Sequence, residues 1–181
     1  MHEGDSMTNF DFLLSSTDFA TFGEAAVAAE RIYAIDTSAC VMTCRRAMEN
    51  AVKWMYSVDS ALTMPWDDKL VSLLSTEEFR DIVDNDLLRR LDYIRRIGNT
   101  AAHDGKKITN DQAMLCLQNL WVFMDFVAYC YGTDYKPGQF DPSLPKQQAV
   151  PVVVVPPETE TKLQELLAEN AALREIGRAH V

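Results

Sequence analysis

The stretch from Tyr93 to Gly105, "YIRRIGNTAAHDG", gathers the residue types that could carry out chemistry. Arg96, Asn99 and His103 are three and seven residues apart, so on a helix their side chains share one face. Metal-independent RNA cleavage needs such a set, because a histidine moves the proton of the 2′-hydroxyl or leaving group and a cation stabilises the phosphorane. These three residues are therefore candidate catalytic residues.

The same residues also fit a structural role at the end of a helix. Polar groups at a packed helix terminus need partners, and Asn99 and His103 could make buried hydrogen bonds with neighbouring helix ends. Gly98 would then allow a second helix to approach closely. The sequence leaves this interpretation open beside catalysis and beside contact with a ligand or RNA.

Basic residues around the motif are candidates for nucleic-acid contact: Arg95, Arg96, Lys106 and Lys107. Acidic residues are interleaved with them, which is typical of a solvated face of mixed charge. The formal net charge of −10 opposes nonspecific binding to a phosphate backbone, because the field of the whole molecule repels a polyanion. Any contact with nucleic acid must therefore depend on a local basic patch.

Helical periodicity predicts the elements that position these residues. Apolar residues recur at helical spacing in four segments: Thr17–Ile35, Asp36–Asp59, Asn85–Gly105 and Thr109–Gly132. Side chains suited to N-caps begin the second and fourth segments, and no strand pattern of useful length is present. We expect an all-α fold over residues 9–132, an up-and-down helical bundle with three long helices and one or two short ones.

Other residues that could bind ligands fit the core of such a bundle. Cys40 and Cys44 lie four apart on an apolar helix face, and the four cysteines have neither CxxC spacing nor a nearby histidine. We expect small core residues rather than metal ligands. Core packing likewise explains the three tryptophans, Trp54, Trp66 and Trp121, the second of which follows the proline that is predicted to begin a short helix.

The segments that flank the bundle have different compositions. Residues 1–8 are expected to be disordered, and residues 133–157 are rich in proline, which predicts a linker or an extended strap. Residues 158–175 predict the start of a coiled coil that could self-associate, with a, d, a and d positions at Leu163, Leu166, Asn170 and Leu173. A solvated amphipathic helix is the alternative, because about two heptads are too short to be stable alone.

The last six residues, "IGRAHV" (176–181), match the translation of a common sequencing adapter. We interpret them as an artefact of read-through and expect the natural protein to continue beyond Glu175. The N-terminus lacks an apolar core of signal-peptide length, and the run "AVPVVVVPP" is too short to span a bilayer. These features predict a soluble, cytoplasmic protein with no membrane partner.

The segments "IRRIGNTAAHDG" and "CRRAMENAVKWMY" carry a family resemblance. They resemble the helical domain of unknown function at the N-terminus of many type I restriction R subunits, which is related to the HEPN superfamily (higher eukaryote and prokaryote nucleotide-binding). The resemblance covers roughly residues 9–132, the linker and the coil start. Asn99 and His103 match the motif of the HEPN ribonucleases, whereas Gly98 stands where those enzymes commonly have an arginine.

The resemblance implies a noncatalytic accessory module of an R subunit, in defence against foreign DNA. Its partners would be the specificity and modification subunits, with DNA bound through the parent complex. The parent would be an ATP-dependent, site-specific deoxyribonuclease that needs ATP and Mg, whereas this fragment needs no cofactor. Neither a P-loop nor a nuclease carboxylate–lysine pattern occurs before Glu175, so those parts would lie elsewhere in the parent. The alternative is a freestanding HEPN-like ribonuclease.

Overall fold

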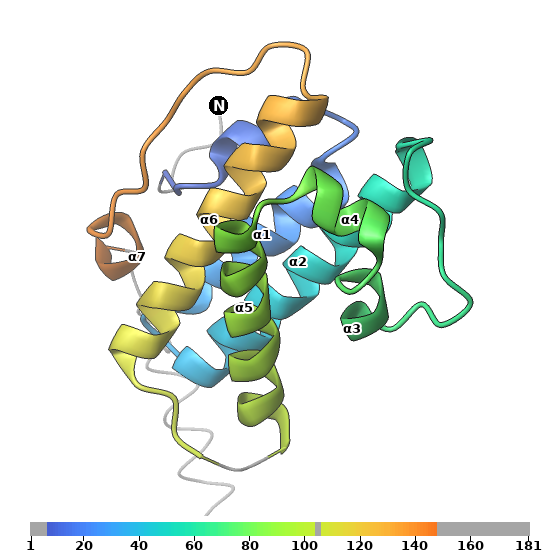
Figure 1. Cartoon of the computed structure of the whole chain (residues 1–181). Helices are drawn as coiled ribbons and strands as arrows, with labels where there is room; N and C mark the ends of the chain where they lie inside the picture. The colour runs from blue at the N-terminus through green and yellow to red at the C-terminus, as the bar shows by residue number, and fades with distance from the viewer. Residues whose placement is uncertain (1–6, 104–105, 148–181) are drawn as a thin grey trace, which may run out of the picture. The chain divides into compact units, whose positions relative to one another are not determined.

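The regular elements of this protein are all helical in the residues that the computed structural model describes, 7–103 and 106–147 (Figure 1). The expected all-α fold is therefore confirmed. In chain order the elements are η1 (Asp11–Ser15, a 3-10 helix), α1 (Ala20–Ile32), α2 (Thr37–Val58), α3 (Leu70–Leu73), α4 (Glu77–Ile82), α5 (Asn85–His103), α6 (Asn110–Tyr131) and α7 (Leu144–Gln147).

Four helices, α1, α2, α5 and α6, make the bundle, rather than three long ones as expected. Helix α2 packs against the other three, and α5 also packs along α6. Their facing sides bury a continuous apolar core that includes Met48, Met55, Leu91, Leu117 and Phe123, all with 0% exposure. Helices α3 and α4 lie at one side of this bundle and the segment leading to α7 at the other (Figure 1).

Side-chain caps fix where two bundle helices begin, as the sequence predicted. The Asp36 carboxylate accepts hydrogen bonds from the backbone amides of Ser38 and Ala39, at 2.8 and 3.0 Å, and so begins α2. Thr109 and Gln112 form a reciprocal capping box at the start of α6. Both caps satisfy amide donors that would otherwise lack a helical partner.

Three of the four cysteines lie in the core, as expected for small apolar residues. Cys40, Cys44 and Cys116 are fully buried at the contact of α2 with α6. Hydrogen bonding to Cys44 together with burial raises the pKa of Cys40 well above its usual range, and burial does the same for Cys44. The thiols of Cys40 and Cys44 are therefore protonated and unreactive at neutral pH.

Trp66 was expected in the core, and this expectation is wrong, because its side chain is fully exposed. No helix begins at the preceding proline. The Asp67 carboxylate instead accepts hydrogen bonds from the backbone amide of Lys69 (3.2 Å) and the hydroxyl of Ser72 (3.0 Å), and α3 begins at Leu70. These hydrogen bonds override the helix-start signal of the proline and leave Trp66 in an irregular segment.

Tyr56 of α2 holds the short helices α3 and α4 against the bundle. Its hydroxyl donates to the carbonyl oxygen of Leu73 (2.7 Å) and lies 2.6 Å from Oγ1 of Thr76, the N-cap of α4. Its ring stacks on Phe79 with a centroid separation of 6.1 Å. One side chain thus links three helices.

Order begins earlier than expected at the N-terminus. Thr8, which was assigned to a disordered segment, is 4% exposed. The reason is local, because its backbone amide and hydroxyl both donate to the Asp11 carboxylate, at 2.9 and 2.6 Å. These bonds fold the chain into η1.

Asn9 joins four segments of the protein. Its backbone amide and Nδ2 donate to the carboxylate of Glu30 in α1, at 3.1 to 3.2 Å. Its side-chain amide also pairs with the backbone of Asp141, through bonds of 3.0 and 2.6 Å, and its carbonyl accepts from Nε1 of Trp121 in α6 at 3.1 Å. The described part of the proline-rich segment, residues 133–147, is therefore held against the bundle as a strap.

Glu30 is a buried carboxylate at the centre of this Asn9 clasp. Its side chain is fully buried, and burial raises the pKa of Glu30 from 4.5 to about 7, although the hydrogen bonds from Asn9 oppose the shift. The nearby carboxylates of Asp11 and Asp141 raise the pKa further. Glu30 therefore titrates near neutral pH while holding the N-terminal segment.

Helix α6 is the one described helix that is long and apolar enough to span a membrane. Half of that apolar stretch is buried in the bundle, where Leu120, Phe123 and Met124 have 0% exposure. The apolar character of α6 is thus accounted for by its contacts with α2 and α5.

Candidate functional site

The motif that could carry chemistry forms the last turns of α5, which continues through His103. This helix is amphipathic, and its core side is apolar: Leu87, Leu91, Ile94, Ile97 and Gly98. The arginines of the motif lie on the remaining sides. The expectation that Arg96, Asn99 and His103 occupy one continuous helix is confirmed.

These three residues share a side of α5 but do not converge on a cavity. The Arg96 side chain is 74% exposed and lies 2.8 Å from Oδ2 of Asp92. His103 is exposed and Asn99 is half-buried, and neither side chain makes a hydrogen bond with a described residue. The helix-end interpretation required buried hydrogen bonds for both, and the described residues supply none.

The four basic candidates for nucleic-acid contact are also spread out. Arg95 faces the side of α5 next to α2 and α3, with its side chain 22% exposed. Lys106 is exposed after the end of α5. Lys107 lines a different hollow of about 590 Å³, together with Tyr33 and Lys146. The sequence cluster therefore does not become one basic patch.

The packing of Arg45 explains why a small residue, Gly98, interrupts the motif. Arg45 of α2 packs directly over it, and a Cβ at position 98 would lie 2.8 Å from Cβ and 2.7 Å from Cδ of Arg45. Real Cβ atoms essentially never approach another carbon so closely. Gly98 thus permits the contact of α2 with α5, as the structural interpretation predicted.

The same contact makes a groove, the Arg45 groove, with a volume of about 230 Å³. It is lined by residues of α2, α3 and α5: Arg45, Glu49, Lys69, Leu70, Val71, Arg95 and Asn99. Nε of Arg45 is buried without a hydrogen-bond partner among the described residues. Its Nη2 lies 3.9 Å from Glu49, which is at the limit of an ion pair. Arg45 is therefore only partly satisfied within the protein.

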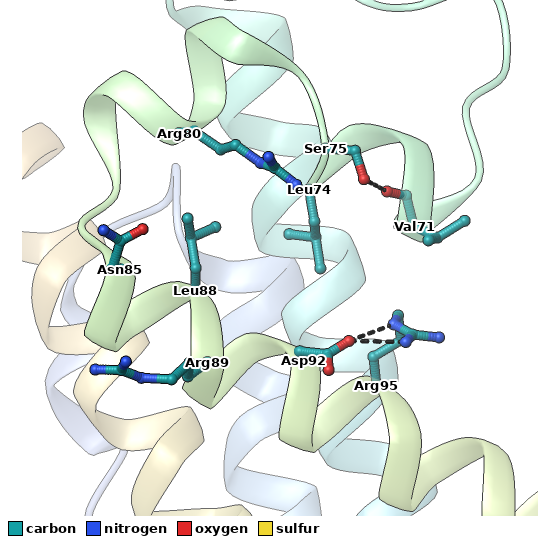
Figure 2. A pocket seen from close by; sticks show the side chains of 9 residues that line it. All are labelled: Val71, Leu74, Ser75, Arg80, Asn85, Leu88, Arg89, Asp92 and Arg95. Atoms are coloured by element: carbon teal, nitrogen blue, oxygen red, sulfur yellow. Dashed lines mark hydrogen bonds and ion pairs between the residues drawn. The ribbon is translucent and has the colours of Figure 1, made fainter.

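A second hollow adjoins this groove through Val71 and Arg95, which line both. This Leu88 hollow lies between α5 and the pair α3–α4 and measures about 510 Å³. Figure 2 shows its lining, in which Leu74 and Leu88 point toward each other below Arg80 of α4. The lining residues are Val71, Leu74, Ser75, Arg80, Asn85, Leu88, Arg89, Asp92 and Arg95.

The surface of the two cavities is basic although the chain is acidic. Five cations line them against two carboxylates, Glu49 and Asp92, which gives a local charge of +3 in a chain of net charge −10. Asp92 is already engaged by Arg95 (2.7 Å) and Arg96 (2.8 Å). Arg80 has no ion pair with a described residue. The surface thus has cationic capacity left for an anionic ligand.

The lining favours binding over catalysis. Among its described residues there is no histidine or cysteine, and both carboxylates are paired with basic side chains. The described residues also hold no group of three or more side chains suited to a metal ion. What remains is recognition of anionic groups by arginine and amide donors beside an apolar floor.

Reasoning from the sequence singled out Arg95 and Asn99 but missed the partners that the fold brings to them. Arg45 comes from α2, Lys69 directly precedes α3, and Arg80 comes from α4. Their separation in the sequence hid the cluster. The one available signal was Gly98, whose position on a helical side next to polar residues indicates a neighbour at close range.

Comparison with known proteins identifies the domain. A family model described as "Domain of unknown function (DUF4145)" matches residues 27–150, which include α1 to α7 from Val27 onward and thus both cavities. No curated protein and no solved structure matches the chain. Because the match covers more than half of the chain, this protein belongs to the DUF4145 family.

Proposed function

We propose that this chain is the noncatalytic N-terminal accessory module of a type I restriction endonuclease R subunit. In this role it docks to the specificity and modification subunits in the cytoplasm and meets DNA through the complex. The nuclease and the ATP- and Mg-dependent motor belong to other parts of the parent protein. The resemblance of the α2 and α5 segments to the R-subunit domain supports this proposal, whereas the description of the DUF4145 family names no function.

One observation carries the choice of binding over catalysis. The side chain of Arg45 fills the space where a side chain at position 98 would stand. His103 is exposed and makes no hydrogen bond with a described residue. A general acid or base must lie within reach of the group that it serves and of the cation that stabilises charge. The described surface offers cations and a groove without such a base, which suits an interaction module.

Two experiments test the proposal, one on the genomic sequence and one on the purified protein. We expect the reading frame after codon 175 in genomic DNA to encode a restriction-nuclease pattern followed by a P-loop, beside genes for specificity and modification subunits. The purified chain should then co-elute with the co-encoded modification–specificity complex in size-exclusion chromatography. A frame without these motifs, or a chain that elutes alone, would refute the proposal.

A freestanding HEPN-like, metal-independent ribonuclease is the second candidate. It is favoured by the shared side of α5 on which Arg96, Asn99 and His103 lie. In this case the His103 imidazole would move the proton and Arg96 would stabilise the phosphorane. Cleavage of labelled RNA in EDTA should then fall at least about a hundredfold in His103→Ala and remain in Arg46→Ala, a change at an exposed residue of α2. Equal cleavage by all three proteins excludes this role.

A further inference from the structure

We propose that the Leu88 hollow is the docking site for an acidic peptide segment of a partner protein, one that carries a bulky apolar residue between carboxylates. This inference deepens the proposed interaction role and rests on it, since it assigns that role a surface and a partner chemistry.

The floor of the hollow is apolar and open. Val71 of α3 is 50% exposed, Leu88 of α5 is half-buried, and Leu74, which follows α3 directly, is 9% exposed. A cavity of roughly 150 Å³ holds a benzene ring, and this hollow measures about 510 Å³. It therefore has room for one large side chain together with the backbone on either side.

Cations surround this floor. In Figure 2, Arg80 lies above Leu74 and Leu88, while Arg89 and Arg95 extend from α5 on either side of them. Arg80 has no ion pair among the described residues, and Arg89 lies 3.5 Å from Asp86 with 77% of its side chain exposed. Arginine binds carboxylates through paired N–H donors, so Arg80 and Arg89 can each take a partner carboxylate.

The acidic groups near the hollow do not prevent Arg80 and Arg89 from binding a partner carboxylate. Asp92 is the one acidic residue in the described lining, and it is bound to Arg95 and Arg96. Asp86, beside the hollow, is bound closely by Arg90 at 2.8 Å and only loosely by Arg89. An incoming carboxylate is therefore attracted rather than repelled at the rim.

The apolar floor decides between a peptide and a nucleic acid. A phosphodiester backbone has no bulky apolar side chain to cover Val71, Leu74 and Leu88. A peptide with an acid–apolar–acid pattern satisfies both features, because it buries its anchor on the floor and places carboxylates at the arginines. Arginine is also one of the residue types that are enriched in the hot spots of protein interfaces.

The test measures binding of a fluorescein-labelled EELFEE peptide by anisotropy, up to about 1 mM, which is the range of weak contacts. The comparison probes are KKLFKK, EESGEE and a short oligothymidylate. We expect EELFEE to bind, and to bind more weakly as salt is added. KKLFKK should not bind, and EESGEE should bind at least about tenfold more weakly because it lacks the apolar anchor.

The variants place this binding in the hollow. Arg80→Glu with Arg89→Glu should weaken EELFEE binding at least about tenfold, because each reversal replaces an attraction with a repulsion. Arg46→Glu reverses one charge, as each substitution of the double variant does, at an exposed position of α2 outside the lining, and should bind like the parent chain. Circular dichroism melting confirms that all variants remain folded, since all three arginines are exposed.

The inference is overturned if EELFEE does not bind up to about 1 mM, or if the double variant binds it as the parent chain does. Oligothymidylate binding more tightly than EELFEE would assign the hollow to nucleic acid instead. The same variants separate this inference from the proposed function. If the double variant still co-elutes with the modification–specificity complex, docking there does not use the hollow. If EELFEE binds but the modification–specificity complex does not, the restriction role is refuted, and the assignment of the hollow as a peptide site is retained.

Discussion

At the scale of single residues, one glycine decides what the motif of α5 can do. Gly98 lies under Arg45, so the position has no room for the arginine that the HEPN ribonucleases commonly carry there. As a consequence, position 98 supports a contact between α2 and α5 and lies beside a groove, and it carries no catalytic arginine. The size of a side chain, rather than its chemistry, sets the character of this site.

Gly98→Ala should therefore destabilise the protein. The new Cβ would meet Cβ of Arg45, which cannot move away unless α2 shifts, and such overpacking typically costs about 1–3 kcal/mol. Urea denaturation measures the free energy of unfolding. Gly138→Ala is the matched control, because its Cβ would meet only Cζ2 of Trp121, at an ordinary 3.4 Å. Equal stability of the two variants would contradict the close contact.

Glu30 should make stability depend on pH. Its pKa is about 7 in the folded protein, against 4.5 for a free side chain, so the folded state binds the proton more tightly than the unfolded state does. This contribution to stability is complete below pH 4.5 and is lost as the pH rises through 7. At 1.36 kcal/mol per pKa unit, the loss is about 3 kcal/mol.

The measurement is the difference in free energy of unfolding between the parent chain and Glu30→Gln, taken from pH 4.5 to 8. Glutamine does not titrate, so this difference isolates Glu30 from groups such as Asp59 and Asp86, whose pKa values lie below the ordinary range because of hydrogen bonds from Tyr131 and Arg90. The parent chain should lose stability relative to the variant across this interval. A constant difference would show that the Glu30 carboxyl does not titrate there.

At the scale of elements, the sequence predicted what local chemistry determines. Asp36 and Thr109 were recognisable as caps because an N-cap acts within three residues. The start of α3 was missed because two local signals competed, and the hydrogen bonds that Asp67 accepts from Lys69 and Ser72 prevailed over the proline before Trp66. The role of Tyr56 could not be predicted, since its partners lie 17 and 20 residues away.

Tyr56→Phe should loosen the α3–α4 pair while leaving the ring stack on Phe79 in place. The change removes the donor to the Leu73 carbonyl, and loss of a buried hydrogen bond typically costs about 1–3 kcal/mol. Chemical denaturation should detect this loss, and hydrogen exchange should rise first in α3 and α4. Tyr93→Phe is the control, because its hydroxyl donates to Gln112 at an exposed position where water replaces the bond. An effect of the same size in both variants would contradict the role of Tyr56.

At the scale of the whole described unit, long-range polar contacts complete the bundle. Asn9 and Asp141 are 132 residues apart in the sequence, yet they exchange two hydrogen bonds. Tyr135 also donates to the Asp125 carboxylate, at 3.1 and 3.2 Å. No periodicity or local cap signals such pairs, which is why the sequence left the form of this segment open between a linker and a strap.

Truncation tests the strap. A chain that ends after Gln147 keeps the Asn9 clasp, whereas a chain that ends after Gly132 loses both hydrogen bonds to Asp141 and leaves the Asn9 side chain less satisfied. Unsatisfied buried polar groups cost about 1–3 kcal/mol each. The shorter chain should therefore melt several degrees lower than the longer one. Identical melting temperatures would mean that the strap adds no stability.

The clasp also has a topological consequence. Because Asn9 and Asp141 are hydrogen-bonded to each other, the path of the chain through the bundle returns to where it began, and the described unit is a nearly closed ring of polypeptide. When the two ends of a chain lie close together, they can be joined and new ends can be made in another exposed segment. A permuted chain that joins these neighbouring ends by a short linker, and starts instead in the exposed segment around Thr63, contains every contact of the core and of the clasp. The order in which the helices are synthesised is thus separable from the structure that they form.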